Sequence, residues 1–131
     1  MPTTGDELLL SILMWREARG DGPDAMQATG CTVRNRVTDK LYGIDTYYGQ
    51  ITKKWQYSSI TADHDPQLGL WPAEHDTLWL DALSLAEGII AGTLADNTNG
   101  AQFYYATTIP LPNWAKDMTM TAQIGRQRFY K

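Results

Sequence analysis

The sequence is poor in the features that mark disulfide-rich, membrane and nucleic-acid-binding proteins. Its single cysteine, Cys31, excludes an internal disulfide and a zinc site built from several cysteines. The longest apolar run, Leu8 to Trp15, is interrupted by Ser11 and falls far short of the ~18 residues that cross a bilayer. Lys and Arg number 11 against 15 Asp and Glu, and a net charge of −4 disfavours partners that need a basic surface. We therefore expect no nucleic-acid partner and no stable membrane insertion.

A basic N-terminal segment and a small-residue cleavage site are also missing, which predicts synthesis in the cytoplasm without a signal peptide. The 131 residues are 43% hydrophobic and 20% charged, which is typical of one folded domain spanning 1–131. We expect a monomer. The five Trp and seven Tyr are an unusual excess, because half-exposed aromatic residues line carbohydrate grooves as well as fill cores.

Three segments have the apolar periodicity and the end signals of helices. Asp6–Arg19 is apolar around most of its circumference, which predicts a helix buried on nearly all sides. Pro23–Asp39 begins with a proline suited to a first helical turn, and Thr77–Ala91 carries its apolar residues on one half-circle. The intervening residues 41–75 predict loops with one short helix near Thr46–Lys54.

The C-terminal third predicts a small β element. Asp96–Gly100 is a dense turn signal, and Ala101–Tyr105 has the composition of a strand. Asn99-Gly100 has the composition of a tight hairpin turn. Together with the three main helices this predicts a predominantly helical α+β domain with a small β-hairpin, whose motif-bearing part covers about residues 6–130.

Glu17 is the acidic residue that stands out. It projects from the apolar face of the first predicted helix, in the last turn, where burial and the helix dipole both raise the pKa of a carboxyl group. A carboxylic acid that stays protonated near neutral pH is suited to general acid catalysis, which glycosidic bond cleavage requires. The alternative is a structural ion pair with an arginine.

Five groups of residues occur in the order found in the SleB-type cell wall hydrolases, and the chain resembles that family over about residues 12–130. The first two are the richest matches, with the family's Glu-Ala-Arg-Gly-Asp run and its Asn-Arg-Val helix end. The matching segments are Trp15–Asp21, Gly30–Val37, Gln56–Ser58, Asp96–Ala101 with Phe103–Tyr105, and Trp114-Ala115 with Ile124–Tyr130.

The resemblance implies a lysozyme-like fold that cleaves peptidoglycan glycan strands at the β-1,4 bond between N-acetylmuramic acid and N-acetylglucosamine, without a cofactor. It implies that Glu17 is the catalytic acid. Two positions depart from the family pattern: Tyr57 replaces a phenylalanine, and Gln127 or a neighbour stands where relatives often carry a histidine. The candidate sugar-binding residues are Tyr57, Ser58, Thr98, Tyr105 and Trp114, whereas Trp55, Trp71 and Trp79 are interpreted as core or loop anchors.

A second catalytic carboxylate is not evident. Asp21, Asp24 and Asp96 are candidates, although Asp24 also suits a first helical turn and Asp96 also suits a turn stabilised by its own side chain. Without a second carboxylate, the sugar's own 6-hydroxyl attacks and a 1,6-anhydro product forms. We therefore favour a lytic transglycosylase over a hydrolytic muramidase that uses a second carboxylate.

Two other classes of protein remain as alternatives. A metal-dependent peptidase or amidase would draw its ligands from Asp63, His64, Asp65 and His75, whose spacing lacks the paired pattern of zinc sites, so we expect no metal. The other alternative is a non-catalytic wall-binding or virion structural module. The expected role is a phage endolysin that depends on a holin for delivery to the periplasmic wall, or a lysin carried in a virion. Because the net charge is negative, we expect aromatic and hydroxyl contacts to dominate wall binding, with weak salt dependence.

Overall fold

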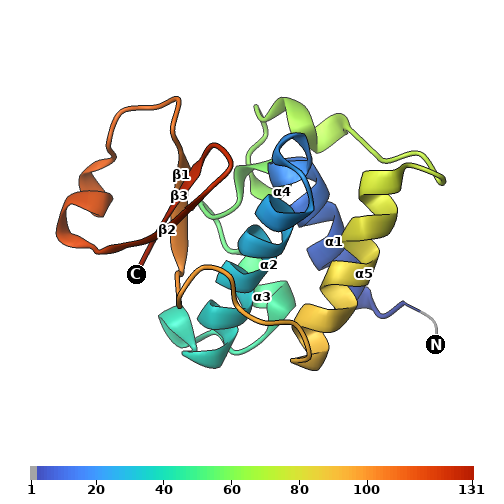
Figure 1. Cartoon of the computed structure of the whole chain (residues 1–131), viewed down its shortest axis with the longest axis horizontal. Coiled ribbons are helices and arrows are strands. Elements are labelled where there is room, and N and C mark those ends of the chain that lie inside the picture. Colours follow the sequence, from blue (N-terminus) through green and yellow to red (C-terminus); the bar gives the residue numbers. More distant parts are fainter. Residues whose placement is uncertain (1–2) are drawn as a thin grey trace.

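The computed structural model describes residues 3–131, and its helices and sheet lie on opposite sides of the molecule (Figure 1). The three long helices are α1 (Gly5–Ala18), α2 (Pro23–Thr38) and α5 (Thr77–Ala91), and each packs against the other two. Their bounds confirm the three predicted helices to within one residue at each end. The ends follow local chemistry: the Thr4 and Asp76 side chains cap α1 and α5, and Gly92 ends α5 in the left-handed conformation.

The core forms where these helices meet. Leu10, Leu13 and Met14 of α1 are fully buried, as the apolar run predicted. Gly30 of α2 is required for the close approach, because a Cβ atom there would lie 2.5 Å from the Met14 sulfur and 2.6 Å from a methyl group of Ile89. The small residues of α2 therefore let three helices share one core.

Residues 41–75 contain more helical structure than the sequence predicted. The short helix α3 (Tyr47–Thr52) lies within the predicted range, and it is joined by α4 (Ser58–Thr61) and by the 3-10 turns η2 (Leu41–Gly43) and η3 (Pro66–Gly69). Each of these additional elements has three or four residues, which is too short to show an apolar period. A further turn, η1 (Arg19–Asp21), follows α1.

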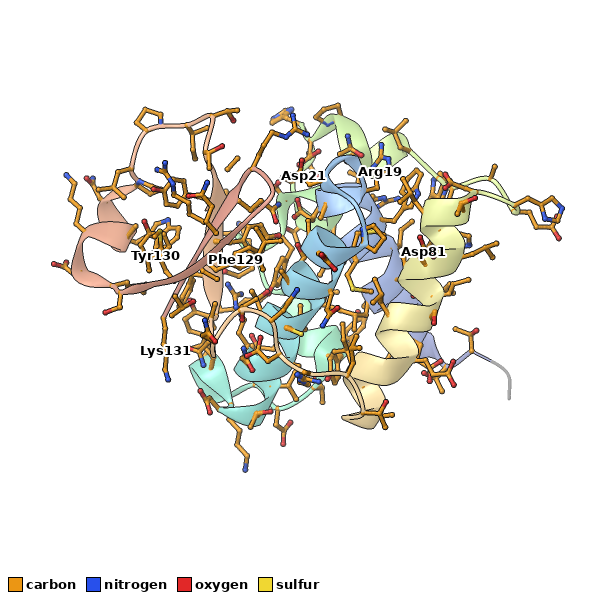
Figure 2. All side chains as sticks on the ribbon, in the orientation of Figure 1. Arg19, Asp21, Asp81, Phe129, Tyr130 and Lys131 are labelled. Carbon is orange, nitrogen blue, oxygen red and sulfur yellow. The ribbon has the colours of Figure 1, made fainter. Side chains whose placement is uncertain are left out.

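The sheet has three antiparallel strands in the order β1-β3-β2. They are β1 (Phe103–Ala106), β2 (Met120–Ile124) and β3 (Gln127–Tyr130), and the 3-10 turn η4 (Asn113–Asp117) precedes β2. Along β3 the side chains alternate, so Phe129 packs on Ala28 of α2 while Tyr130 packs on the outer face (Figure 2).

The predicted position of the hairpin turn was wrong. The hairpin joins β2 to β3 through Gly125, whereas Asn99-Gly100 precedes β1 and no strand lies before it in residues 3–98. Asn99 and Gly100 do adopt positive φ, as a tight hairpin turn needs, but Asp96 binds the backbone of this segment and makes it a closed loop. In the described part of the chain, no helix combines the length and apolar character needed to span a membrane.

Candidate active site

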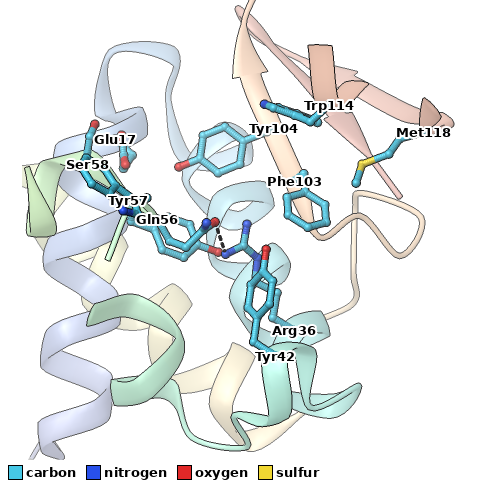
Figure 3. A pocket seen from close by; sticks show the side chains of 11 residues that line it. Glu17, Arg36, Tyr42, Gln56, Tyr57, Ser58, Phe103, Tyr104, Trp114 and Met118 are labelled. Carbon is cyan, nitrogen blue, oxygen red and sulfur yellow. Dashed lines mark hydrogen bonds between the residues drawn. The ribbon is translucent and has the colours of Figure 1, made fainter. Parts of the chain in front are cut away.

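Glu17 lies in the last turn of α1, half-buried, at the end of a groove between the helices and the sheet (Figure 3). The groove has a volume of about 530 Å³. It is lined mainly by aromatic and polar side chains: Glu17, Arg36, Tyr42, Trp55, Gln56, Tyr57, Ser58, Phe103, Tyr104, Trp114 and Met118. Glu17 is the one carboxylate among these lining residues.

Burial, followed by the negative charge of Asp65, raises the pKa of Glu17 from its usual 4.5 to about 7. The hydroxyl and backbone amide of Ser59 and the hydroxyl of Tyr104 interact with the carboxyl group and offset part of this rise. At neutral pH Glu17 therefore exists in comparable protonated and ionised populations, which suits a group that first donates and then accepts a proton.

Tyr104 of β1 points its hydroxyl toward Glu17 across the groove (Figure 3). Burial and then the charge of Glu17 raise the pKa of Tyr104 well above its usual value, so the phenol stays neutral and donates to the carboxylate. Tyr104 belongs to the family-like segment Phe103–Tyr105, but the residue of this segment predicted to bind sugar was its neighbour Tyr105. A strand alternates its side chains, so Tyr105 points away from Tyr104, and it packs on Trp114 and Tyr130 instead of lining the groove.

The segment that forms one wall of the groove has unusual backbone geometry. Trp55 and Tyr57 both have positive φ, 72° and 47°, a region that large side chains rarely adopt. Tyr57 is nevertheless buried, with its hydroxyl 3.1 Å from that of Thr32. Such strain persists only where surrounding contacts hold it in place, and it is concentrated at functional sites.

Arg36 of α2 forms the floor of the groove and was missed as a site residue. Its guanidinium lies 4.8 Å from the centroids of both the Tyr57 and Phe103 rings. It donates to the Gln102 carbonyl at 2.6 Å and to the Gln56 side chain at 2.9 Å, the latter drawn in Figure 3. The Asn-Arg-Val motif was the available signal, and its arginine ties both walls of the groove to α2.

Arg16, the neighbour of Glu17, positions the wall formed by residues 55–59. It is buried and donates to the carbonyl groups of Ser59 and Leu70, at 3.0 and 3.1 Å. The Ser59 hydroxyl is also buried and has no well-aligned partner elsewhere in the described chain. Arg16 thus holds the Ser59 segment against Glu17, a role that its apolar surroundings in the sequence did not suggest.

The three predicted second carboxylates lie outside the groove. Asp21 accepts from the Arg126 side chain at 2.8 Å and from its backbone amide at 3.1 Å; burial acts to raise its pKa, but these bonds leave the pKa lowered. Asp24 is exposed in the first turn of α2. Asp96 accepts from Thr98, Asn35 and Gly100, and these bonds outweigh burial and lower its pKa.

Asp65 is the acidic residue whose charge acts on Glu17, and it was considered only as a metal ligand. Its carboxylate accepts from the Ser58 hydroxyl at 2.6 Å and from the Gln67 backbone amide at 2.8 Å. Asp65 therefore caps the N-terminal end of η3 and fixes Ser58 at the groove wall. In residues 3–131 no three His, Cys, Asp or Glu side chains gather as metal ligands would, and this includes Asp63, His64, Asp65 and His75.

Of the predicted sugar-binding residues, Tyr57, Ser58 and Trp114 line the groove, whereas Thr98 and Tyr105 do not. Thr98 is fully buried and its hydroxyl bonds Asp96 and the Ala101 amide. Tyr105 stacks on Tyr130 with ring centroids 5.5 Å apart, on the other face of the sheet.

Trp55 and Trp71 are exposed and lie in loops, and Trp79 packs at the edge of the core, so of the two alternatives, core or loop anchor, the core applies to Trp79 alone. Gln127, near the position where relatives often carry a histidine, donates to the backbone carbonyl of Glu17 at 3.4 Å and accepts from Thr29 at 3.4 Å. It joins β3 to the helix end that carries Glu17.

The chain matches one protein family in sequence and two solved structures in fold. The profile of a family described as Cell Wall Hydrolase matches residues 20–130, a range that begins just after Glu17. Two solved structures are similar to the chain: the catalytic domain of the Bacillus cereus SleB protein, and the catalytic domain of the germination-specific lytic transglycosylase SleB from Bacillus anthracis. Each structure is 22% identical to this chain in sequence, with a TM-score of 0.75. The match to the Bacillus cereus domain covers 99% of this chain and 93% of that structure. The match to the Bacillus anthracis domain covers 100% of both chains. Both structures share the fold of this chain. No curated protein matches the chain.

Proposed function

This chain belongs to the cell wall hydrolase family, and on that premise we propose that it cleaves peptidoglycan glycan strands with Glu17 as general acid and base. The bond is the β-1,4 link between N-acetylmuramic acid and N-acetylglucosamine. The observation that carries the proposal is a half-buried carboxyl with a pKa of about 7 at the end of an aromatic-lined groove. Glycosidases need such a protonated acid beside the leaving oxygen.

In the first step protonated Glu17 donates its proton to the glycosidic oxygen while the bond from that oxygen to C1 of N-acetylmuramic acid breaks. N-acetylglucosamine leaves with a free 4-hydroxyl group, and positive charge develops at C1. Tyr104 and Ser59 then stabilise the ionised carboxylate that remains. Arg36 holds the groove wall through Gln56 and the Tyr57 ring, which orients the strand past Glu17.

In the second step we propose that the 6-hydroxyl oxygen of the same N-acetylmuramic acid bonds to C1 and gives its proton to Glu17, which regenerates the acid. The product is a 1,6-anhydro end, so no water is consumed. The absence of another carboxylate among the lining residues supports this lytic transglycosylase route, because both hydrolytic mechanisms use a second carboxylate.

A hydrolytic muramidase is the second candidate, and the position of Asp65 favours it. Its charge acts on Glu17, but the Ser58 hydroxyl and the Gln67 amide occupy its oxygens. In this route Asp65 would orient a water molecule for attack at C1. Asp65 does not line the groove, so the transglycosylase route has the stronger support.

Mass spectrometry of the fragments released from purified peptidoglycan tests the proposal. Anhydro ends are expected; reducing N-acetylmuramic acid ends would instead establish the hydrolase, and released peptides alone would establish a peptidase or amidase. Glu17→Gln should retain the fold and wall binding and release no fragments, whereas Glu87→Gln, an exposed residue of α5, should remain active. A Glu17→Gln variant that still clears peptidoglycan would overturn the assignment, and a wild-type protein that binds the wall without cleaving it would be a structural module.

We also propose that the protein acts as a monomeric phage endolysin that reaches the wall through a holin. Expression of the protein inside bacteria should cause lysis only when a holin is co-expressed. Lysis without a holin would contradict this delivery route, and detection of the protein in purified phage particles would favour a virion lysin.

A further inference from the structure

A second cavity of about 390 Å³ adjoins the groove that contains Glu17. Trp55 and Ser58 line both cavities, so they form a shared wall, while Lys54, Thr61, Ala62 and His64 line the second cavity alone. Its lining comes from residues 54–64, which carry α4 and the loops on either side of it. This part of the protein lies outside the reaction steps described above.

Trp55 is the unusual member of the shared wall. Its side chain is 82% exposed, so burial offsets little of its unfavourable backbone conformation, which has φ of 72°. Large residues rarely adopt this region, and such outliers cluster at active sites, ligand clamps and switch regions. The Lys54 ammonium lies 4.9 Å from the indole centroid and supports the ring in its exposed position.

The polar groups of the second cavity match an uncharged, hydroxyl-rich ligand. The Ser58 hydroxyl donates to Asp65 and the Thr61 hydroxyl donates to the Gln56 carbonyl, so each oxygen is left as an acceptor. Lys54 is balanced by Asp63, which lines the same cavity, and the pair gives no net charge to attract a carboxylate. A broad apolar ring beside such groups suits a pyranose, which has an apolar C–H face and a polar edge.

We propose that Trp55 marks an additional saccharide subsite, through which the glycan strand continues from the Glu17 groove into the cavity beside His64. This inference rests on the proposed function, since it extends the binding path of the same substrate. The strand would stack on the indole and hydrogen-bond to the Ser58 and Thr61 oxygens. The subsite favours long strands over short ones.

The test compares cleavage of peptide-free glycan strands in a series of defined lengths. Trp55→Ala should lower kcat/KM on the longest strands by about tenfold, the effect typical of truncating an anchoring tryptophan, and should lower it less on the shortest substrates. Ala62→Phe places a ring in the second cavity without touching the groove and should cause the same length-dependent loss. Tyr48→Ala is the matched control, because Tyr48 is 66% exposed and lines neither cavity.

The outcomes separate this inference from the proposed function. If the wild-type protein cleaves no glycan of any length, the proposed function fails. If it cleaves but Trp55→Ala affects all lengths equally, Trp55 belongs to the catalytic groove alone and the subsite is overturned. A second series of strands that keep their stem peptides completes the test, and a loss seen only on that series would overturn the subsite in favour of a stem-peptide site. A folded Ala62→Phe variant with full activity on long peptide-free strands would show that the cavity is not used.

Discussion

The three-helix core consists of regular helices with buried apolar side chains, whereas the wall of the groove at residues 55–59 has strained backbone and a buried polar side chain. In the core, Leu10, Leu13 and Met14 are fully buried on a regular helix. In the groove wall, Trp55 and Tyr57 have left-handed backbone, and the buried Ser59 hydroxyl has no well-aligned partner within residues 3–131. The favourable packing of the core offsets the unfavourable backbone conformations of the wall, and the wall in turn holds groups that can interact with a substrate.

The largest stability effect should come from the core. Leu13→Ala removes a fully buried side chain, and we expect the free energy of unfolding to fall by about 2–5 kcal/mol. Leu80→Ala is the control, because Leu80 on α5 is half-exposed, and it should lower the free energy of unfolding far less. Chemical denaturation followed by circular dichroism measures both. Equal losses would mean that the core is not the main source of stability.

Glu17→Gln, in contrast, should raise the free energy of unfolding, and the size of this increase should depend on pH. The pKa of Glu17 is 4.5 when unfolded and about 7 when folded, so the folded state binds more protons between these values. The wild-type protein therefore loses stability as pH rises from 4.5 through 7, by up to about 3 kcal/mol, and Gln does not ionise. Above pH 7 the variant should be more stable by up to that amount, and near pH 4 the two should be similar. Thermal denaturation across this pH range measures the difference, and a variant less stable than wild type at pH 8 would contradict it.

The same contrast explains what the sequence could predict. The apolar periods of residues 6–19, 23–39 and 77–91 determine the core helices, and Glu17 stood out because it interrupts one of these patterns. The groove wall depends on left-handed residues and on distant contacts such as Arg16 with the Ser59 carbonyl, which leave no local pattern. Asp96 stabilises a turn through its own side chain, which was one of its two predicted roles, and Thr98 belongs to the same turn and does not line the groove.

Two substitutions of residues that act on Glu17 should move the pH dependence of activity in opposite directions. Activity should fall as pH rises through about 7, where Glu17 loses its proton. Asp65→Asn removes a negative charge that raises the pKa of Glu17, so this fall should move to lower pH. Tyr104→Phe removes a donor to the carboxylate, so the fall should move to higher pH.

A pH–activity profile on soluble glycan fragments measures both shifts. Asp63→Asn is the matched control, because Asp63 is an exposed residue two positions before Asp65, and this variant should leave the pH–activity profile unchanged. Thermal denaturation should show that all three variants are folded. If Asp65→Asn and Tyr104→Phe moved the profile in the same direction, Glu17 would not be the group that sets it.

The smallest effect should come from the contact that joins the two sides of the molecule at the surface. The Arg126 side chain, 68% exposed, bonds Asp21 at 2.8 Å and links the β2–β3 turn to the end of η1. Exposed ion pairs contribute about 0–1 kcal/mol, so Arg126→Ala should lower the free energy of unfolding by no more than this. The backbone amide at 126 also bonds Asp21 and remains in the variant. The difference should shrink further at high salt, because screening weakens the wild-type pair. A loss of several kcal/mol at high salt would mean that the sheet depends on this one contact, and that the helical core does not hold the groove's far wall in place.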